Sequence, residues 1–144
     1  MHLQYDDDDL REVLTSTRTI AMVGASPDPQ RDSHRVMAYL QARGYRVIPV
    51  NPGCAGDEVL GERVFASLED IPASVSVDMV DVFRRSEAVP EICESAIRLG
   101  AKTLWLQLGV VHGPAARRAR EYGLNVVMDR CPKIDIPRLG LEEA

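Results

Sequence analysis

The sequence predicts an α/β fold in which helices cover both faces of a parallel sheet. Three times an amphipathic segment ends at a glycine and an apolar, β-branched run follows, at Gly44, Gly100 and Gly123. Glycine is favoured just past a helix end, because the chain there often turns through a positive φ. A helix, a glycine and a buried strand, repeated at short intervals, are typical of βαβ units and of a parallel sheet.

Size and composition narrow the class of protein. The chain has 144 residues, 45% of them hydrophobic and 5% aromatic. This length favours a single domain over residues 1–144, with a core at about 15–140 built mainly from aliphatic side chains. A net charge of −5 argues against a nucleic-acid surface. No apolar run is long enough to cross a membrane, and the acidic first nine residues do not form a signal peptide.

Cysteine and histidine spacing excludes the common metal and redox motifs. The three cysteines are isolated, and no pair has metal-ligand or redox spacing. His2, His34 and His112 are far apart, so structural or surface roles are expected for them. Together with the composition, these features indicate a cytoplasmic protein.

The expected strands and helices alternate along the chain. Right-handed crossovers with one reversal after strand three predict a five-stranded, Rossmann-like three-layer sandwich in the order 3-2-1-4-5. A short edge strand is expected at 64–65, within an irregular stretch from 52 to 72, and a surface loop is expected after Cys131. The expected strands span 19–24, 45–50, 77–83, 103–106 and 125–128, and the helices 8–15, 33–43, 86–99 and 114–122.

Function is expected at the carboxyl ends of the strands, where such sheets bind ligands. The first strand ends at Gly24, and a helix N-terminus follows near Ser33, where an anion is stabilised. The loop is a poor match to the dinucleotide fingerprint G-x-G-x-x-G, because Ser26 and Pro29 replace its second and third glycines. The second strand ends at Asn51 without the carboxylate that binds a ribose 2′-hydroxyl.

The remaining strand ends carry further polar groups. Arg84 follows the third strand and can pair with a phosphate, and Gln107 follows the fourth. At the fifth, Arg130 beside Cys131 either activates the thiol or forms a structural pair with an aspartate, and the structural pair is favoured. Asp78 and Asp81, inside the third strand, are expected to be hydrogen-bonded rather than to act as an acid/base pair.

These strand ends resemble the small, single-domain CoA-binding proteins of bacteria and archaea, which are similar to the N-terminal CoA-binding domain of the succinyl-CoA synthetase α subunit. The resemblance rests on six segments in order, at residues 23–26, 29–33, 44–52, 80–84, 105–109 and 128–131. It implies that the glycine loop contacts the phosphates of coenzyme A and that the other segments line the crevice. The implied binding residues are Gly24, Ala25, Ser26, Arg31, Ser33, Asn51, Pro52, Phe83, Arg84, Gln107 and Gly109.

Three classes of function remain open on the sequence, the third being an interaction protein whose crevice is vestigial. The favoured one is a non-catalytic module that binds CoA or an acyl-CoA, as a sensor, store or carrier, with no nucleic-acid or membrane partner and an unknown protein partner. Ligase activity is not expected of this chain alone, because the resemblance does not extend to the second domain that carries the phosphohistidine in the ligase. The alternative is an enzyme, either an NAD(P)-dependent oxidoreductase or a CoA-thioester enzyme that uses Cys131.

Overall fold

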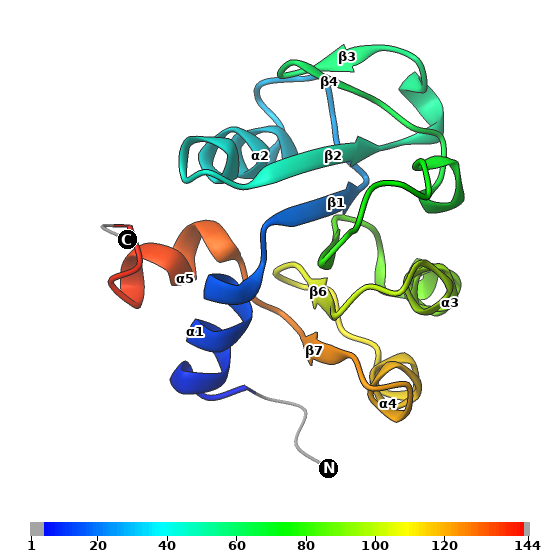
Figure 1. The fold of residues 1–144 in the computed structure, drawn as a ribbon. Coiled ribbons are helices and arrows are strands. Elements are labelled where there is room, and N and C mark those ends of the chain that lie inside the picture. The colour runs from blue at the N-terminus through cyan, green and yellow to red at the C-terminus, as the bar shows by residue number, and fades with distance from the viewer. Residues whose placement is uncertain (1–4, 143–144) are drawn as a thin grey trace.

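Five parallel strands form the central sheet of the computed structural model, which describes residues 5–142 (Figure 1). They run in the order β2-β1-β5-β6-β7, and each neighbouring pair is parallel. The α/β, Rossmann-like class is therefore confirmed. The strands are β1 (Thr19–Val23), β2 (Arg46–Val50), β5 (Met79–Val82), β6 (Thr103–Leu106) and β7 (Asn125–Val127).

The expected strand order is found when one short segment is counted as a strand. Phe65 forms an isolated parallel bridge with Val50, the last residue of β2. If this segment is counted as strand three, the sheet reads 3-2-1-4-5, and β7 follows as a sixth strand. If only the five regular strands are counted, the order is 2-1-3-4-5. The strand expected third, at 77–83, therefore lies beside β1 and not at the edge, because the segment at Phe65 takes the edge position.

Helices cover both faces of the sheet, as predicted. α1 (Asp7–Ser16), α2 (Asp32–Ala42) and α5 (Pro132–Arg138) lie on one face, while α3 (Val89–Leu99) and α4 (Gly113–Glu121) lie on the other (Figure 1). Each face has its own buried cluster, one around Met37 and Trp105, the other around Leu104 and Ala116. Within residues 5–142 no helix has both the length and the apolar character to span a bilayer.

Local sequence explains most of the helix ends. The side chain of Asp6 caps α1 by accepting a hydrogen bond from the backbone amide of Asp9 at 2.8 Å, and the side chain of Asp9 accepts one from the backbone amide of Asp6. This capping box satisfies amides that the first helical turn leaves free. The three glycines at the helix–strand joints all have positive φ, between 79° and 98°, which confirms the joints.

The irregular stretch from 52 to 72 contains a hairpin of β3 (Glu58–Val59) and β4 (Glu62–Arg63), flanked by the short 3-10 helices η1 (Pro52–Cys54) and η2 (Leu68–Asp70). The helix expected from residue 86 starts with a 3-10 turn, η3 (Ser86–Ala88), and becomes α-helical at Val89.

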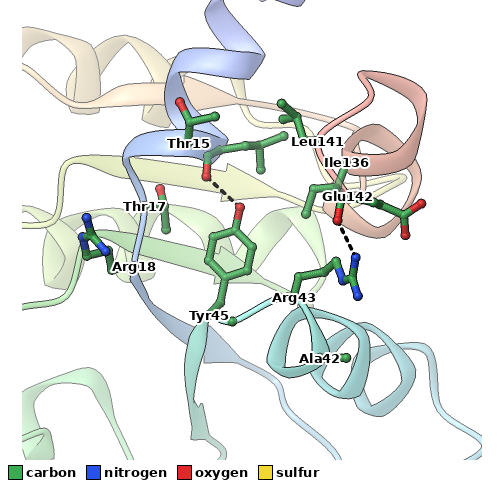
Figure 2. Close-up of a pocket in the computed structure, with 11 residues that line it drawn as sticks. Thr15, Thr17, Arg18, Ala42, Arg43, Tyr45, Ile136, Leu141 and Glu142 are labelled. Atoms are coloured by element: carbon green, nitrogen blue, oxygen red, sulfur yellow. Dashed lines mark hydrogen bonds between the residues drawn. The ribbon is translucent and has the colours of Figure 1, made fainter. Parts of the chain in front are cut away.

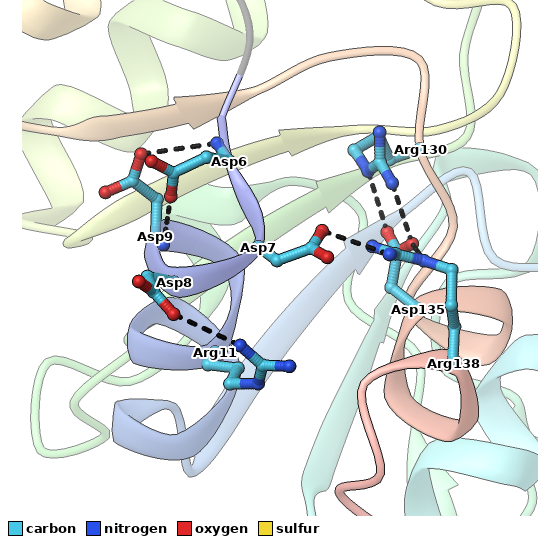
Figure 3. A network of polar contacts seen from close by, with 8 residues as sticks. All are labelled: Asp6, Asp7, Asp8, Asp9, Arg11, Arg130, Asp135 and Arg138. Atoms are coloured by element: carbon cyan, nitrogen blue, oxygen red, sulfur yellow. Dashed lines mark hydrogen bonds and ion pairs between the residues drawn. The ribbon is translucent and has the colours of Figure 1, made fainter.

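The prediction of a surface loop after Cys131 is wrong, because residues 132–138 form the helix α5. Asp135 anchors this helix and is only 2% exposed. Its two carboxyl oxygens accept hydrogen bonds at 3.0 Å from the guanidinium of Arg130, and Arg138 adds a third contact at 3.2 Å. Arg138 also pairs with Asp7 of α1 at 3.0 Å, so the network links α5 to α1 (Figure 3).

Candidate functional site

The strand order reverses between β1 and β5, which places a crevice at their carboxyl ends. β1 is followed by α2 on one face, and β5 is followed by α3 on the opposite face. The two loops therefore leave the sheet in opposite directions. Such a switch point is where open α/β sheets bind their ligands.

Gly24 brings the two loops together at this point. Its φ is 87°, and a Cβ added there would lie 2.3 Å from the carbonyl oxygen of Phe83. Its amide also donates to the carbonyl of Val50 at 2.9 Å, and the Phe83 amide donates to Val23 at 2.8 Å. Gly24 is thus needed because the backbones of three strand ends approach here.

The loop from Gly24 to Ser33 is held by its own side chains. The backbone amide of Ser26 donates to the hydroxyl oxygen of Ser33 at 3.1 Å. The backbone amide of Asp28 donates to the hydroxyl oxygen of Ser26 at 3.1 Å. The amide group of Asn51 donates to the carbonyl of Ala25 at 2.8 Å. Ser26 accepts in its contact, so its hydroxyl hydrogen is free to donate to a ligand.

Two arginines with free guanidinium groups lie on the loops that follow β1 and β5. Arg31 precedes α2, and Arg84 follows β5 with its Cδ 3.2 Å from the position of a Cβ on Gly24. Both are exposed, and across residues 5–142 neither side chain has an ion-pair or hydrogen-bond partner. A pair of unpaired cations beside donor-rich loops suits an anionic ligand.

Two cavities flank the loop after β5. The β2–α3 cavity, of about 290 Å³, is lined among others by Val50, Pro52, Leu68, Arg84 and Ile92. The α2–α5 cavity, of about 260 Å³, has apolar walls of Val36, Phe83, Leu108, Cys131 and Ile134, and its polar lining residues are Asp32, Arg35, Gln107 and Lys133. The adjacent residues Phe83 and Arg84 thus contribute to different cavities.

Gln107 lies between the α2–α5 cavity and a buried carboxyl group. Its amide nitrogen is placed 2.9 and 3.2 Å from the two carboxyl oxygens of Asp81, the orientation that satisfies both residues. Asp81 is 0% exposed. Burial raises its pKa well above the ordinary value, and a backbone hydrogen bond at Val82 acts in the opposite direction.

Comparison with known proteins identifies the family. The model of the family described as "CoA binding domain" matches residues 18–137, most of the chain. The chain belongs to the CoA-binding domain family. A Bacillus subtilis relative, described only as "Uncharacterized protein YneT", is 40% identical over 126 residues, which are 88% of this chain and 90% of that protein.

Two further relatives of this CoA-binding domain differ in how much of their own length matches this chain. A Thermus thermophilus protein of known structure is 40% identical, with a TM-score of 0.88, and the match covers 94% of this chain and 99% of that one. The α subunit of an ADP-forming acetate–CoA ligase from Pyrococcus furiosus is 27% identical over 130 residues, which are 81% of this chain and 28% of that subunit.

Four of the eleven predicted binding residues line one of the two cavities, namely Pro52 and Arg84 in the β2–α3 cavity and Phe83 and Gln107 in the α2–α5 cavity. Gly109 lines neither cavity, and its amide donates to the Asp129 carboxylate at 2.7 Å. Ser33 is buried, with its hydroxyl oxygen bonded to Ser26, so it supports the loop. Leu108 and Ile134 also line the α2–α5 cavity and are not among the predicted residues; Ile134 reaches the cavity only because residues 132–138 form α5.

Cys131 is buried, as expected, with 6% exposure. Within the described residues its sulfur has no hydrogen-bond partner, and Arg130 is bound to Asp135. Activation of a thiol by a general base needs a hydrogen bond between the two groups, so the thioester-enzyme alternative gains no support. His112 caps α4 through Nδ1, which accepts from Ala115 at 3.1 Å, and His2 lies outside the described residues. Residues 5–142 contain no cluster of potential metal ligands.

A larger pocket, of about 460 Å³, opens at the other edge of the sheet (Figure 2). The Tyr45 hydroxyl donates to the carbonyl of Leu14 at 2.6 Å, and Arg43 donates to the carbonyl of Glu142 at 2.8 Å. This pocket lies at the amino ends of β1 and β2, away from the switch point. Its side chains hold α1, α2 and the C-terminal segment together, so size alone does not make it the ligand site.

Proposed function

We propose that this protein binds coenzyme A or a CoA thioester in the crevice at the carboxyl ends of β1 and β5, without catalysing a reaction on it. The observation that carries the proposal is the pairing of a preformed loop, from Gly24 to Ser33, with the unpaired guanidinium groups of Arg31 and Arg84. CoA carries a pyrophosphate and a 3′-phosphate, which need cations and hydrogen-bond donors. Membership of the CoA-binding domain family supports this choice of anion.

The phosphates of CoA would lie along the loop after β1, between Arg31 and Arg84. The Ser26 hydroxyl and the free amides at the start of α2 would donate to them. The nucleotide end would lie over Pro52 in the β2–α3 cavity, and the pantetheine arm would cross the loop after β5 towards the mouth of the α2–α5 cavity. In this arrangement Gly24, Ala25, Ser33 and Asn51 support the loop rather than contact the ligand through their side chains.

The biological setting is part of the same proposal. The chain would act as one cytoplasmic domain that senses, stores or presents CoA. No acid, base or activated nucleophile faces the crevice within residues 5–142 in a hydrogen-bonded catalytic arrangement, which favours a binding role over an enzymatic one.

Calorimetry with CoA tests the phosphate placement. Charge-assisted hydrogen bonds contribute about 1.5–3 kcal/mol each, so Arg31→Ala and Arg84→Ala should each weaken CoA binding about ten- to hundred-fold. Added salt should weaken the wild type as well. Arg117→Ala, at an exposed position of α4, is the control and should leave affinity unchanged. Absence of CoA binding by the wild type rejects the function, and unchanged affinity in both crevice variants rejects the placement.

A further inference from the structure

Exposed apolar side chains gather at the mouth of the α2–α5 cavity. In residues 5–142 five large hydrophobic residues are classed as exposed, and two of them, Leu108 at 57% and Ile134 at 53%, line this one cavity. They come from the loop after β6 and from α5, which are distant in sequence. Apolar surface gathered around a concavity is typical of a binding site.

Three of the four polar side chains of the cavity are already engaged. Asp32 pairs with Arg35, which also donates to the carbonyl of Gln30 at 2.6 Å. Gln107 is held by Asp81. The exposed ammonium group of Lys133 lies 6.0 Å from the centre of the Tyr39 ring and, among the described residues, has no ion-pair or hydrogen-bond partner. Away from this ammonium group, a phosphate or an amide placed here would lose hydrogen bonds to water and recover few from side chains. An aliphatic group makes no hydrogen bonds to water and therefore loses none on entering the cavity.

The size of the cavity also favours a small apolar group. Its volume is about 260 Å³, roughly nine waters at their share of liquid volume. This is too small for the whole of CoA and is suited to a short aliphatic chain. Phe83 in this cavity is followed in the chain by Arg84, which lines the β2–α3 cavity, so the two cavities lie on either side of the loop after β5.

We propose that the preferred ligand is a CoA thioester with a short aliphatic acyl group, and that the α2–α5 cavity holds this group between Phe83, Leu108 and Ile134. This inference rests on the proposed CoA-binding function and specifies its substrate class. It assigns the exposed side chains of Leu108 and Ile134 a role in selecting the acyl group.

Calorimetry with CoA, acetyl-CoA, butyryl-CoA and hexanoyl-CoA tests the inference. Each buried methylene should tighten binding up to about fourfold, until the cavity is full. Leu108→Ser and Ile134→Ser should reduce the gain per methylene and leave the affinity for free CoA unchanged. Both positions are exposed, so the fold should tolerate the changes. Leu60→Ser is the matched control, because Leu60 is an exposed leucine of the β3–β4 hairpin, and it should leave the whole series unchanged.

The outcomes separate this inference from the function on which it rests. If the wild type binds CoA but shows no dependence on chain length, the acyl site is rejected and the CoA site stands. If Leu108→Ser or Ile134→Ser weakens CoA and every thioester equally, the cavity holds the pantetheine arm, and the acyl site is again rejected. If neither CoA nor its thioesters bind, both proposals fail.

Discussion

Two properties make Gly24 irreplaceable, and only one of them is visible in the sequence. Its position after an apolar strand indicates a tight turn, and the structure confirms a φ of 87°. The second property is the close approach of the Phe83 carbonyl, 2.3 Å from the position of an added Cβ. This contact joins residues almost sixty positions apart, so it follows from the strand order rather than from local sequence.

Replacing Gly24 should therefore cost more stability than replacing a glycine that only turns the chain. Left-handed strain costs about 1–2 kcal/mol, and overpacking adds about 1–3 kcal/mol. We expect Gly24→Ala to lower the free energy of unfolding by about 2–5 kcal/mol in urea denaturation. Gly44→Ala is the control, because its φ is 98° but nothing lies within 4 Å of its added Cβ, so only the first cost applies. Equal losses in the two variants would contradict the role of the Phe83 contact.

The buried pair of Asp81 and Gln107 predicts a pH dependence of stability. Burial raises the pKa of Asp81, so the folded protein holds this proton more tightly than the unfolded chain does. The contribution of Asp81 to stability therefore falls as pH rises from the ordinary value of 3.8 towards the raised pKa. Asp81→Asn keeps an oxygen to accept from Gln107 and does not titrate. Its melting temperature should gain on the wild type as pH rises through this window, and parallel curves would disprove the linkage.

At the scale of elements, the sequence predicted the helices that have apolar periodicity and missed α5, which depends on salt bridges. α1 to α4 each begin or end within a few residues of expectation. α5 has only seven residues and a proline inside it, so neither periodicity nor helix propensity indicates it. Pro132 at its start was the available signal. The stabilising contacts of Asp135 with Arg130 and Arg138 are tertiary, as Figure 3 shows.

Removing the Asp135 carboxylate should loosen α5. Loss of one partner from a buried ion pair costs about 3–5 kcal/mol, and the partial exposure of Arg130, 35%, lowers this. We expect Asp135→Ala to cost about 2–3 kcal/mol of unfolding free energy and to increase hydrogen exchange in α5. Glu94→Gln, at the exposed pair with Arg118, should leave the unfolding midpoint unchanged. An unchanged midpoint in Asp135→Ala would show that apolar packing alone holds α5.

At the scale of the whole molecule, the sequence predicted the layers and the edge of the sheet that carries the crevice, but not the shape of the cavities. The helix–glycine–strand joints specify parallel strands, and parallel strands share one carboxyl edge. The α2–α5 cavity combines side chains from α2, α5 and the loops after β5 and β6. Such a wall depends on packing between distant segments, which one sequence without aligned relatives does not reveal.

The crevice as a whole should prefer CoA to NAD and NADP by at least tenfold. A dinucleotide pyrophosphate needs close backbone approach at the second glycine of its fingerprint, and here that position is Ser26, fixed by bonds to Ser33 and Asp28. At the end of β2, no carboxylate awaits the 2′-hydroxyl of NAD, and the Asn51 amide already binds Ala25 and Gly53. The pyrophosphate and the 2′-hydroxyl of NAD would each be left with unsatisfied hydrogen-bonding groups, at a cost of about 1–3 kcal/mol each. The sum of the two costs sets the tenfold limit. Competition calorimetry with the three ligands measures the preference, and NAD binding as tightly as CoA would revive the oxidoreductase alternative.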